Sequence, residues 1–365
     1  MRTPTVMLVL AGSLLGQQSA AEDKFSIQHM HYQENDERMK VGYTTLGLEK
    51  DFGTDYTIKL DYGYDAISGA TPVWKNHPKQ AGEFQEGLQN IPAETRQSAS
   101  GAFTLRDSLR NEYTVAAAYS YEPDFISREL SAQAMLWEDE LHNRSYSIGA
   151  AWQDNTSVAS EFTNHSSNAH SHILNYQAGV TQVIDASSSL EFSVYGGHER
   201  GYLSNHYLKI VRKAMDGNHL DFDHRPDWRD SGGIALRHLR AWQPSLSSNL
   251  WYRFYQDNWS IQAHTVEAKL YWDLSSWLRL NPVLRHHQQT GANFYRGYRD
   301  NPSWFAPRGY GSSDARLGAF SAQTAQLNVE FKADKSYSLN IGGSYYQQNN
   351  GFSAWWLSTG LVWKL

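Results

Sequence analysis

Hydrophobic and polar residues alternate along many short segments of this chain. From residue 56 to 65, every second side chain is apolar or aromatic, and most of the residues between them are polar or charged. The same period of two recurs at 145–152, 189–194, 265–272 and 324–332. Successive side chains of a β-strand point to opposite faces, so each segment predicts a strand with one apolar and one polar face. A soluble β-sandwich would alternate in the same way, so no single strand decides the architecture.

Extending this pattern predicts sixteen strands, each about long enough to cross a bilayer when tilted. They cover residues 24–34, 39–51, 55–65, 97–107, 111–122, 126–137, 144–153, 171–184, 188–199, 232–243, 247–257, 260–272, 276–288, 320–332, 336–347 and 354–365.

The lengths of the connections favour one architecture. Every even connection is short, and the four long ones, 66–96, 154–170, 200–231 and 289–319, are all odd. In an up-and-down barrel, connections of one parity lie on one rim, and bacterial outer-membrane barrels have short periplasmic turns and long extracellular loops. A Greek-key sandwich offers no reason for this parity. We therefore predict an all-β protein, a transmembrane antiparallel up-and-down barrel of about sixteen strands.

The end of the chain agrees with a barrel. Apolar residues alternate from Trp355 through Trp363 to the last residue, Leu365. A closed barrel must pair its last strand with its first, so a strand that ends flush with the chain is expected. Trp355 and Trp363 are about 20 Å apart along a tilted strand, close to the separation of two interfacial aromatic girdles. We assign Trp355, Trp363 and Leu365 to the girdles and to a C-terminal assembly signal.

The first residues predict export. Residues 1–21 combine Arg2, an apolar stretch from Val6 to Leu15 and small residues before position 22, as in a secretory signal peptide. The mature barrel would span 22–365, and no later segment is apolar for long enough to form a membrane helix. The chain has no cysteine, which excludes disulfides, a lipid anchor and covalent haem attachment.

Composition narrows the function further. The chain has 32 Lys and Arg against 38 Asp and Glu, a net charge of −6, which argues against a nucleic-acid partner. Charged residues of both signs fall on the polar faces of the strands, where they would line the lumen. These are Lys59, Asp61, Glu112, Glu129, Arg253, Glu267, Lys269, Arg279, Arg285, Glu330 and Lys332.

A ring of sixteen strands is too wide for side chains alone to fill, so water or infolded loops must occupy it. A lumen closed by salt bridges is the alternative to an open pore. If the pore is open, its acidic excess predicts a weak preference for cations.

Two long loops are rich in aromatic and arginine side chains. Such residues could fold into the mouth as a constriction, or could stack on sugars or dock a partner protein. The candidates are Tyr202, Tyr207, Trp228, Tyr295, Arg296, Arg299, Trp304 and Tyr310.

Other constellations are weaker. His29 and His31 would share one strand face and could bind a transition metal, but no third ligand is fixed by spacing. The acidic loop 216–223 lacks the EF-hand register, and no GxSxG motif marks a hydrolase nucleophile. We therefore expect no catalytic residues, no metal and no cofactor.

Several segments resemble a known family. They are HYQEND (31–36), LEKDFGTDYTIKLDYGYDAISGATP (48–72), YSYEPDFISR (119–128), GYLSNHYLKIV (201–211), RPDWR (225–229), YRFYQDNWSIQAHT (252–265) and the stretch 285–295. Together they resemble the bacterial outer-membrane family known as domain of unknown function 3570, over nearly the whole mature chain. The resemblance implies an outer-membrane barrel and brings no substrate or catalytic residue. His206, His286, His287 and Leu365 depart from the family's expected pattern.

The sequence thus predicts a porin-like channel, or a barrel component of an envelope complex, in the outer membrane of a Gram-negative bacterium. A non-conducting scaffold or sheath for a periplasmic or extracellular redox partner is the alternative, and an outer-membrane hydrolase is a third candidate. Expected partners are outer-membrane lipid, lipopolysaccharide and the barrel assembly machinery, with a periplasmic or extracellular protein as a further candidate.

Overall fold

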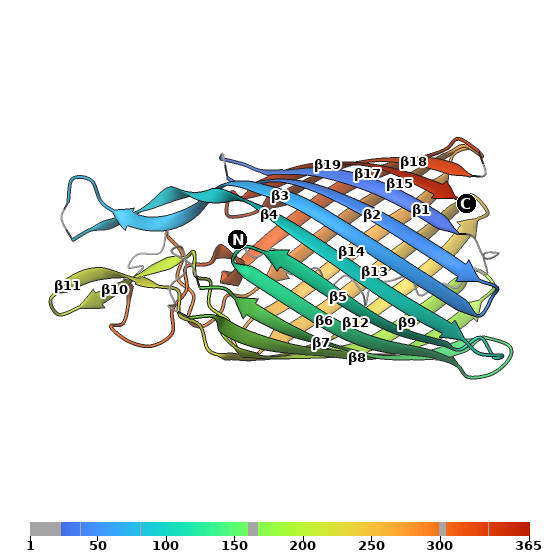
Figure 1. Cartoon of the computed structure of the whole chain (residues 1–365), viewed down its shortest axis with the longest axis horizontal. Coiled ribbons are helices and arrows are strands. Elements are labelled where there is room, and N and C mark those ends of the chain that lie inside the picture. Colours follow the sequence, from blue (N-terminus) through green and yellow to red (C-terminus); the bar gives the residue numbers. More distant parts are fainter. Residues whose placement is uncertain (1–22, 37, 81, 160–166, 299–303, 335) are drawn as a thin grey trace.

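The computed structural model describes residues 23–36, 38–80, 82–159, 167–298, 304–334 and 336–365. These residues form a closed antiparallel barrel of sixteen strands, with each strand paired to its neighbours in the chain order (Figure 1). The predicted fold class is therefore confirmed. The predicted signal peptide, 1–21, lies outside the described residues. No helix among the described residues is long and apolar enough to cross a membrane.

The barrel consists of β1–β9, β12–β15 and β17–β19. Their bounds are β1 Lys24–Glu34, β2 Lys40–Phe52, β3 Tyr56–Asn76, β4 Phe84–Arg106, β5 Glu112–Glu122, β6 Phe125–Trp137, β7 Arg144–Ser157, β8 Ala169–Asp185, β9 Ser188–Gly201, β12 Trp228–Gln243, β13 Leu246–Asp257, β14 Gln262–Asp273, β15 Leu278–Gln289, β17 Phe320–Lys332, β18 Tyr337–Gln348 and β19 Ser353–Lys364.

The first and last strands close the ring. β1 pairs with β19 along its whole length, from Lys24 opposite Lys364 to Glu34 opposite Ala354. At the last residue, the Leu365 backbone N–H donates to the carbonyl of Asp23, 2.8 Å away. The closure leaves neither β1 nor β19 with an unpaired edge, as expected of a strand that runs to the last residue.

The outer surface of the barrel is apolar. Its middle carries exposed aliphatic side chains such as Leu60, Leu130, Ile148 and Leu284. Exposed aromatic residues lie toward both ends of the strands. Those toward the short turns include Phe52, Tyr56, Phe103, Trp242, Trp272, Trp277, Tyr337 and Trp363, and those toward the long loops include Tyr64, Tyr119, Tyr121, Trp152, Trp228, Tyr345 and Trp355. This is the apolar band with two girdles that a bilayer requires.

The segment 66–96, predicted as a long loop, is instead mostly strand. β3 and β4 remain paired from Gly69 opposite Ile91 to Asn76 opposite Phe84, and this hairpin projects beyond the rim (Figure 1). The register shifts between Ile67 and Gly69, where the hairpin leaves the barrel. Gly69 has φ +132°, and a Cβ there would lie 2.4 Å from the carbonyl oxygen of Arg38, so only glycine fits this bend.

The other long connections also contain structure. β10 (Lys209–Ala214) and β11 (Gly217–Phe222) form a second projecting hairpin, and β16 (Trp304–Phe305) pairs parallel to β10. A 3-10 helix, η1, follows at Ala315–Leu317. We call the β3–β4 extension, this small sheet and the segments 202–208, 223–227, 291–298 and 306–318 the cap. It covers the end of the barrel that carries the long loops.

Candidate functional site

The cap has an apolar centre of its own. Ile210 and Val211 of β10 are fully buried, as is Val73 of the β3 extension at 1 % exposure. The Trp74 indole N–H donates to Ser313 Oγ at 3.2 Å, and the Tyr298 hydroxyl donates to the carbonyl of Pro72 at 2.9 Å. Segments more than 200 residues apart in the chain are therefore packed as one unit above the lumen.

A buried ion-pair cluster ties two cap segments together. Arg225 Nε donates to Asp223 Oδ2 at 2.7 Å, and its Nη2 donates to Asp314 Oδ2 at 2.8 Å. All three side chains are less than a tenth exposed. Burial alone would raise the pKa of the Asp314 carboxyl, but Arg316 and Arg225 together hold that pKa below its usual range. The ion pairs of Asp314 are thus present at neutral pH.

A second apolar cluster joins the cap to the rim. Trp259, in the turn between β13 and β14, packs edge-on against Phe294 with ring centroids 5.2 Å apart. Ile261, Ala292 and Leu317 complete the buried cluster. The turn and the cap residues Ala292, Phe294 and Leu317 therefore share one small core, and the cap is held to the barrel by packing as well as by polar contacts.

The segment 202–208 leaves β9 and reaches the part of the wall formed by β4–β7. His206 is 3 % exposed; its Nε2 lies 3.0 Å from Asp124 Oδ2 in the β5–β6 turn, and its Nδ1 lies 3.3 Å from Ser157 Oγ of β7. The next residue, Tyr207, donates its hydroxyl to Asp124 Oδ2 and to Glu94 Oε1 of β4. These contacts hold the segment across the mouth.

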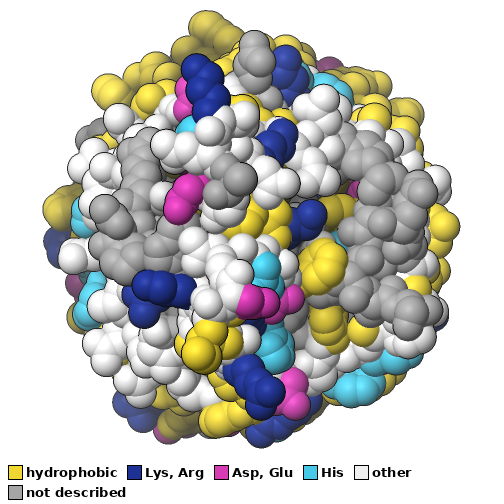
Figure 2. Space-filling view, turned by 90° about the vertical axis from the view of Figure 1, so that its left-hand side faces the viewer, with side chains coloured by type: hydrophobic (Ala, Val, Ile, Leu, Met, Phe, Trp, Pro, Cys, Tyr) yellow, Lys and Arg dark blue, Asp and Glu magenta, His cyan; other side chains and the backbone are white. Residues whose placement is uncertain are grey.

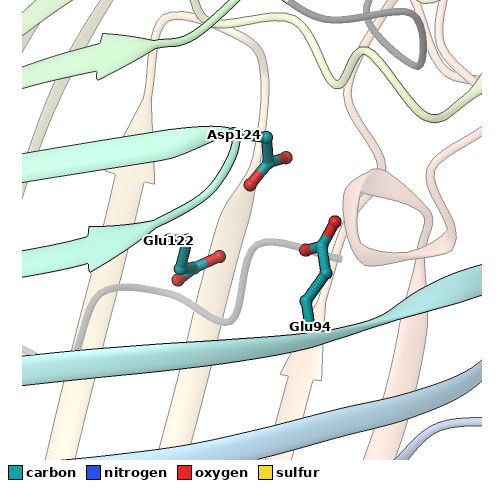
Figure 3. Close-up of side chains that lie close together, drawn as sticks. All are labelled: Glu94, Glu122 and Asp124. Atoms are coloured by element: carbon teal, nitrogen blue, oxygen red, sulfur yellow. The ribbon is translucent and has the colours of Figure 1, made fainter.

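Acidic side chains gather where this segment meets the wall. Glu94, Glu122 and Asp124 each offer a carboxylate oxygen within 4.8 Å of the others, and Figure 3 shows the three carboxyl groups facing one space. Arg96 lies beside them, 2.5 Å from Asp65 Oδ2 and 3.9 Å from Glu122 Oε1. The guanidinium of Arg96 is thus shared by Asp65 and Glu122, two of the four carboxylates gathered here.

The contacts of the cap keep Asp124 charged. Burial raises the pKa of the Asp124 carboxyl, but hydrogen bonds from His206 and Tyr207 outweigh it and leave that pKa below its usual range. The pKa of Tyr207 is raised, because its hydroxyl is buried and donates to Asp124. At neutral pH, Asp124 is therefore an anion and Tyr207 a neutral donor.

These contacts also place a hydroxyl, an imidazole and a carboxylate side by side, as in the nucleophile, base and carboxylate of a hydrolase triad. The three residues are Ser157, His206 and Asp124. Ser157 is 3 % exposed beneath the cap, so a substrate would reach it only after the cap moves. Ser157 contacts the Nδ1 of the imidazole and the carboxylate contacts Nε2, the reverse of the serine-protease arrangement.

Beneath the cap, the inner wall is polar and reached by solvent. The side chain of Lys59 is half exposed although it faces the lumen beside Asp61, and Arg285 is also exposed. Carboxylates dominate the inner face of β1–β6, whereas Arg and Lys are concentrated on that of β12–β17. The two walls therefore create a field across the lumen. Figure 2 shows the capped end, where charged, histidine and apolar side chains are interspersed.

A family model described as "Protein of unknown function (DUF3570)" matches residues 8–361. The chain belongs to this family. The resemblance noted from its motifs is thereby confirmed, and the DUF3570 barrel described here gives those motifs their places in the wall and the cap. No curated protein matches the sequence.

Solved structures similar to this DUF3570 barrel are outer-membrane proteins with 6–10% sequence identity. The CymD monoaromatic hydrocarbon channel has a TM-score of 0.45 and 6% identity, with 95% of this chain and 90% of CymD covered. The siderophore receptor PirA from Pseudomonas aeruginosa has a TM-score of 0.42 and 8% identity, with 89% and 56% covered. CdiB from Acinetobacter baumannii has a TM-score of 0.46 and 8% identity, with 94% and 60% covered. The chain spans little more than half the length of the siderophore receptors.

The predicted lumen residues all lie on strands, on the face opposite the exposed apolar side chains. Several are paired there: Lys59 with Asp61 at 3.6 Å, and Arg279 with Asp273 at 2.7 Å. Arg253 donates to the Tyr195 hydroxyl at 2.7 Å. Their part in solute passage stays a prediction.

The predicted loop residues separate into different places. Tyr207 reaches the wall, Tyr295 packs against the Trp259 cluster, and Arg296 lies over the ring of Phe305. Tyr310 is half exposed on the cap, and Trp228 is exposed on the outer face, where Arg200 lies over its ring; the role of these residues in a constriction or in partner binding stays a prediction.

For the remaining loop candidates, the structure gives only a position. Tyr202 is partly buried at the start of the segment that crosses the mouth. The backbone of Trp304 pairs in β16, and Arg299 lies outside the described residues.

Among the described residues, neither the pair His29 and His31 nor the acidic loop belongs to a group of three candidate metal ligands. His29 and His31 face outward, where His29 contacts Thr44 and His31 packs beside Trp355. In the acidic loop, Asp221 is bound by Arg212, and Asp223 by Arg225.

Sequence reasoning missed the cluster of Glu94, Glu122 and Asp124 together with His206. The signal for it was weak: the i, i+2 pair Glu122 and Asp124 beside a predicted turn, and a histidine where the family pattern leads one to expect proline.

Proposed function

We propose that the protein is a porin-like channel of the Gram-negative outer membrane, closed at its extracellular mouth by the cap. The observation that supports this is the combination of a charged inner wall, accessible to solvent, with a cap held by separate contacts. Lys59 and Arg285 are exposed beneath the cap, and a lumen packed solid with salt bridges would bury them. Opening would require release of the 202–208 segment and of the Arg225 cluster, not unfolding of the barrel.

Planar-bilayer conductance tests the channel. We expect the full-length protein to be silent or to open rarely, and Arg225→Met to show frequent conductance steps of defined size, because the cap loses its buried ion pairs. Arg110→Met is the matched control, since Arg110 and Asp55 form an exposed pair at the opposite end of the barrel. Silence of both variants, with the barrel shown to be folded, would contradict conduction.

A scaffold for a protein partner is the second candidate. It is favoured by the two hairpins that project beyond the rim, since the β10–β11 hairpin exposes Met215 and Phe222. Silent bilayers with every cap variant, together with loss of partner capture when the hairpin tip, residues 213–219, is replaced by a Gly-Ser linker, would support the scaffold over the channel.

A hydrolase is the third candidate, favoured by the order of Ser157, His206 and Asp124. Turnover of phospholipids or short-chain esters, lost in Ser157→Ala, would establish it. We expect no turnover that depends on Ser157, because the hydroxyl is buried.

Lipid and lipopolysaccharide would contact the outer face, and the assembly machinery would recognise the strand ending at Trp363 and Leu365.

A further inference from the structure

Three carboxylates from separate parts of the wall converge in the mouth. Glu94 belongs to β4, Glu122 ends β5, and Asp124 lies in the turn that follows. One oxygen of each lies within 4.8 Å of the other two, and their carboxyl groups face a common space (Figure 3). Carboxylates at this spacing repel one another unless a proton or a cation lies between them.

In the described part of the chain, the positive charge of Arg96 is shared at this point. Arg96 is divided between Asp65 and Glu122. His206 and Tyr207 both approach the Oδ2 atom of Asp124. The other oxygen, Asp124 Oδ1, is buried and accepts no hydrogen bond from the described residues. The side chain is only 9 % exposed, so this oxygen has lost water without gaining a partner.

The spacing of the oxygens suits one class of ion. Ca²⁺ binds oxygen ligands at about 2.3–2.6 Å, so oxygens on opposite sides of the ion lie about 5 Å apart. Mg²⁺ requires about 2.0–2.1 Å and near-ideal octahedral geometry, which a site of three side-chain carboxylates meets less readily. Oxygens no more than 4.8 Å apart can all contact one Ca²⁺, and water would complete its shell.

We propose that Glu94, Glu122 and Asp124 bind a divalent cation of the size of Ca²⁺ at the mouth of the barrel. The ion would neutralise the excess of carboxylates around Arg96 and would give Asp124 Oδ1 its missing partner. Because Asp124 also holds His206 and Tyr207, the bound ion would fix the anchor of the 202–208 segment. Binding itself does not depend on whether the lumen conducts.

Isothermal titration calorimetry with CaCl₂ on the full-length protein in detergent tests the site. We expect one site per chain that is at least tenfold weaker, or lost, in both Glu122→Gln and Glu94→Gln. Glu122→Gln removes one ligand and keeps the contact of His206 with Asp124 and those of Tyr207 with Asp124 and Glu94. Glu129→Gln is the matched control, because Glu129 is an inward carboxylate that contacts Gln153 outside the cluster. Circular dichroism and heat-dependent gel mobility would verify that each variant is folded.

Terbium(III) gives a second readout. The Tyr207 ring lies beside the cluster, so an ion bound there should show luminescence sensitised by tyrosine, and CaCl₂ should displace it. Absence of Ca²⁺ binding at millimolar concentration by the folded protein would overturn the proposal. Equal affinity of wild type, Glu94→Gln and Glu122→Gln would also overturn it, because the ion would then occupy another place. Conductance plays no part in either readout, so failure here is distinct from failure of the channel.

Discussion

The imidazole of His206 and the carboxylate of Asp124 meet across the mouth of the barrel, with Nε2 and Oδ2 3.0 Å apart. One residue belongs to the long segment after β9 and the other to a tight turn between β5 and β6, 82 positions earlier in the chain. Both side chains are buried, so the contact is shielded from water. It joins the segment 202–208 of the cap to the wall.

Replacing His206 with alanine should release the segment 202–208. Asp124 keeps Tyr207 as a donor but loses its imidazole partner, and loss of one partner of a buried charged group costs roughly 1–3 kcal/mol. We therefore expect hydrogen exchange in residues 202–208 to accelerate about tenfold, with the barrel strands unchanged, as measured by mass spectrometry. His219→Ala, at an exposed position of β11, should change neither region. Unchanged exchange in His206→Ala would show that packing alone holds the segment.

Replacing Arg225 with methionine should loosen the cap further. Arg225 bridges two buried carboxylates, Asp223 and Asp314, and removing one partner of a buried ion pair costs about 3–5 kcal/mol. We expect the cap to become cleavable by trypsin at concentrations that leave the wild type intact, while the barrel remains resistant. The same digestion of Arg110→Met should match the wild type. A wild-type digestion pattern in Arg225→Met would show that the ion pairs contribute little.

The strands could be predicted from sequence because a barrel imposes one rule on every position. Each strand meets lipid on one side and water on the other, so the period of two is visible locally. The predictions for 24–34 and 320–332 coincide with β1 and β17. The β3–β4 extension was missed because Ser68, Gly69 and Pro72 look like turn residues. That segment is strand because β3 and β4 remain paired there, and Trp74 also contacts Ser313 in another segment of the cap.

The contacts at the mouth could not be predicted, because they join segments that are far apart in the chain. Glu94 is brought to Glu122 by the register of β4 with β5, which sets Gln97 opposite Tyr121. That register depends on pairing along the whole strand. The segment containing His206 then reaches the same point through packing of the cap, which has no periodic signal. Alternation along the chain says which face a side chain occupies, but not which side chains meet across the mouth.

The cap should resist acid. The pKa of Asp314 is held below its usual range, so the stability that this group contributes is fully present above the carboxyl's unfolded pKa of about 4. It is lost only as pH falls through the lower folded pKa. Near-UV circular dichroism of the cap aromatics should therefore be unchanged from pH 7 to about pH 4. Asp314→Asn should show a weaker signal throughout this range. Loss of the wild-type signal between pH 6 and 5 would show that another titrating group controls the cap.

The lumen charges predict selectivity. Carboxylates such as Asp61 and Glu129 line the inner face of β1–β6, so currents through Arg225→Met should reverse at a potential that indicates a weak preference for K⁺ over Cl⁻ in a KCl gradient. Adding Asp61→Asn and Glu129→Gln should reduce this preference, and high salt should reduce it further by screening. A preference for Cl⁻ would contradict this prediction. It would mean that Arg253, Arg285 and the other basic residues on the inner face of β12–β17 determine which ion passes.

The orientation of the wall gives the last prediction. Leu130 and Ser131 are neighbours on β6, but Leu130 is 59 % exposed on the outer face and Ser131 faces the lumen. An arginine on the lipid face near the middle of the bilayer costs about 2–4 kcal/mol, whereas an arginine in an aqueous lumen is hydrated. Leu130→Arg should therefore lower the folded fraction in lipid vesicles at intermediate urea concentrations, and Ser131→Arg should fold nearly as the wild type does. Equal destabilisation by the two would contradict a solvated lumen, and the reverse order would mean that the inner and outer faces have been exchanged.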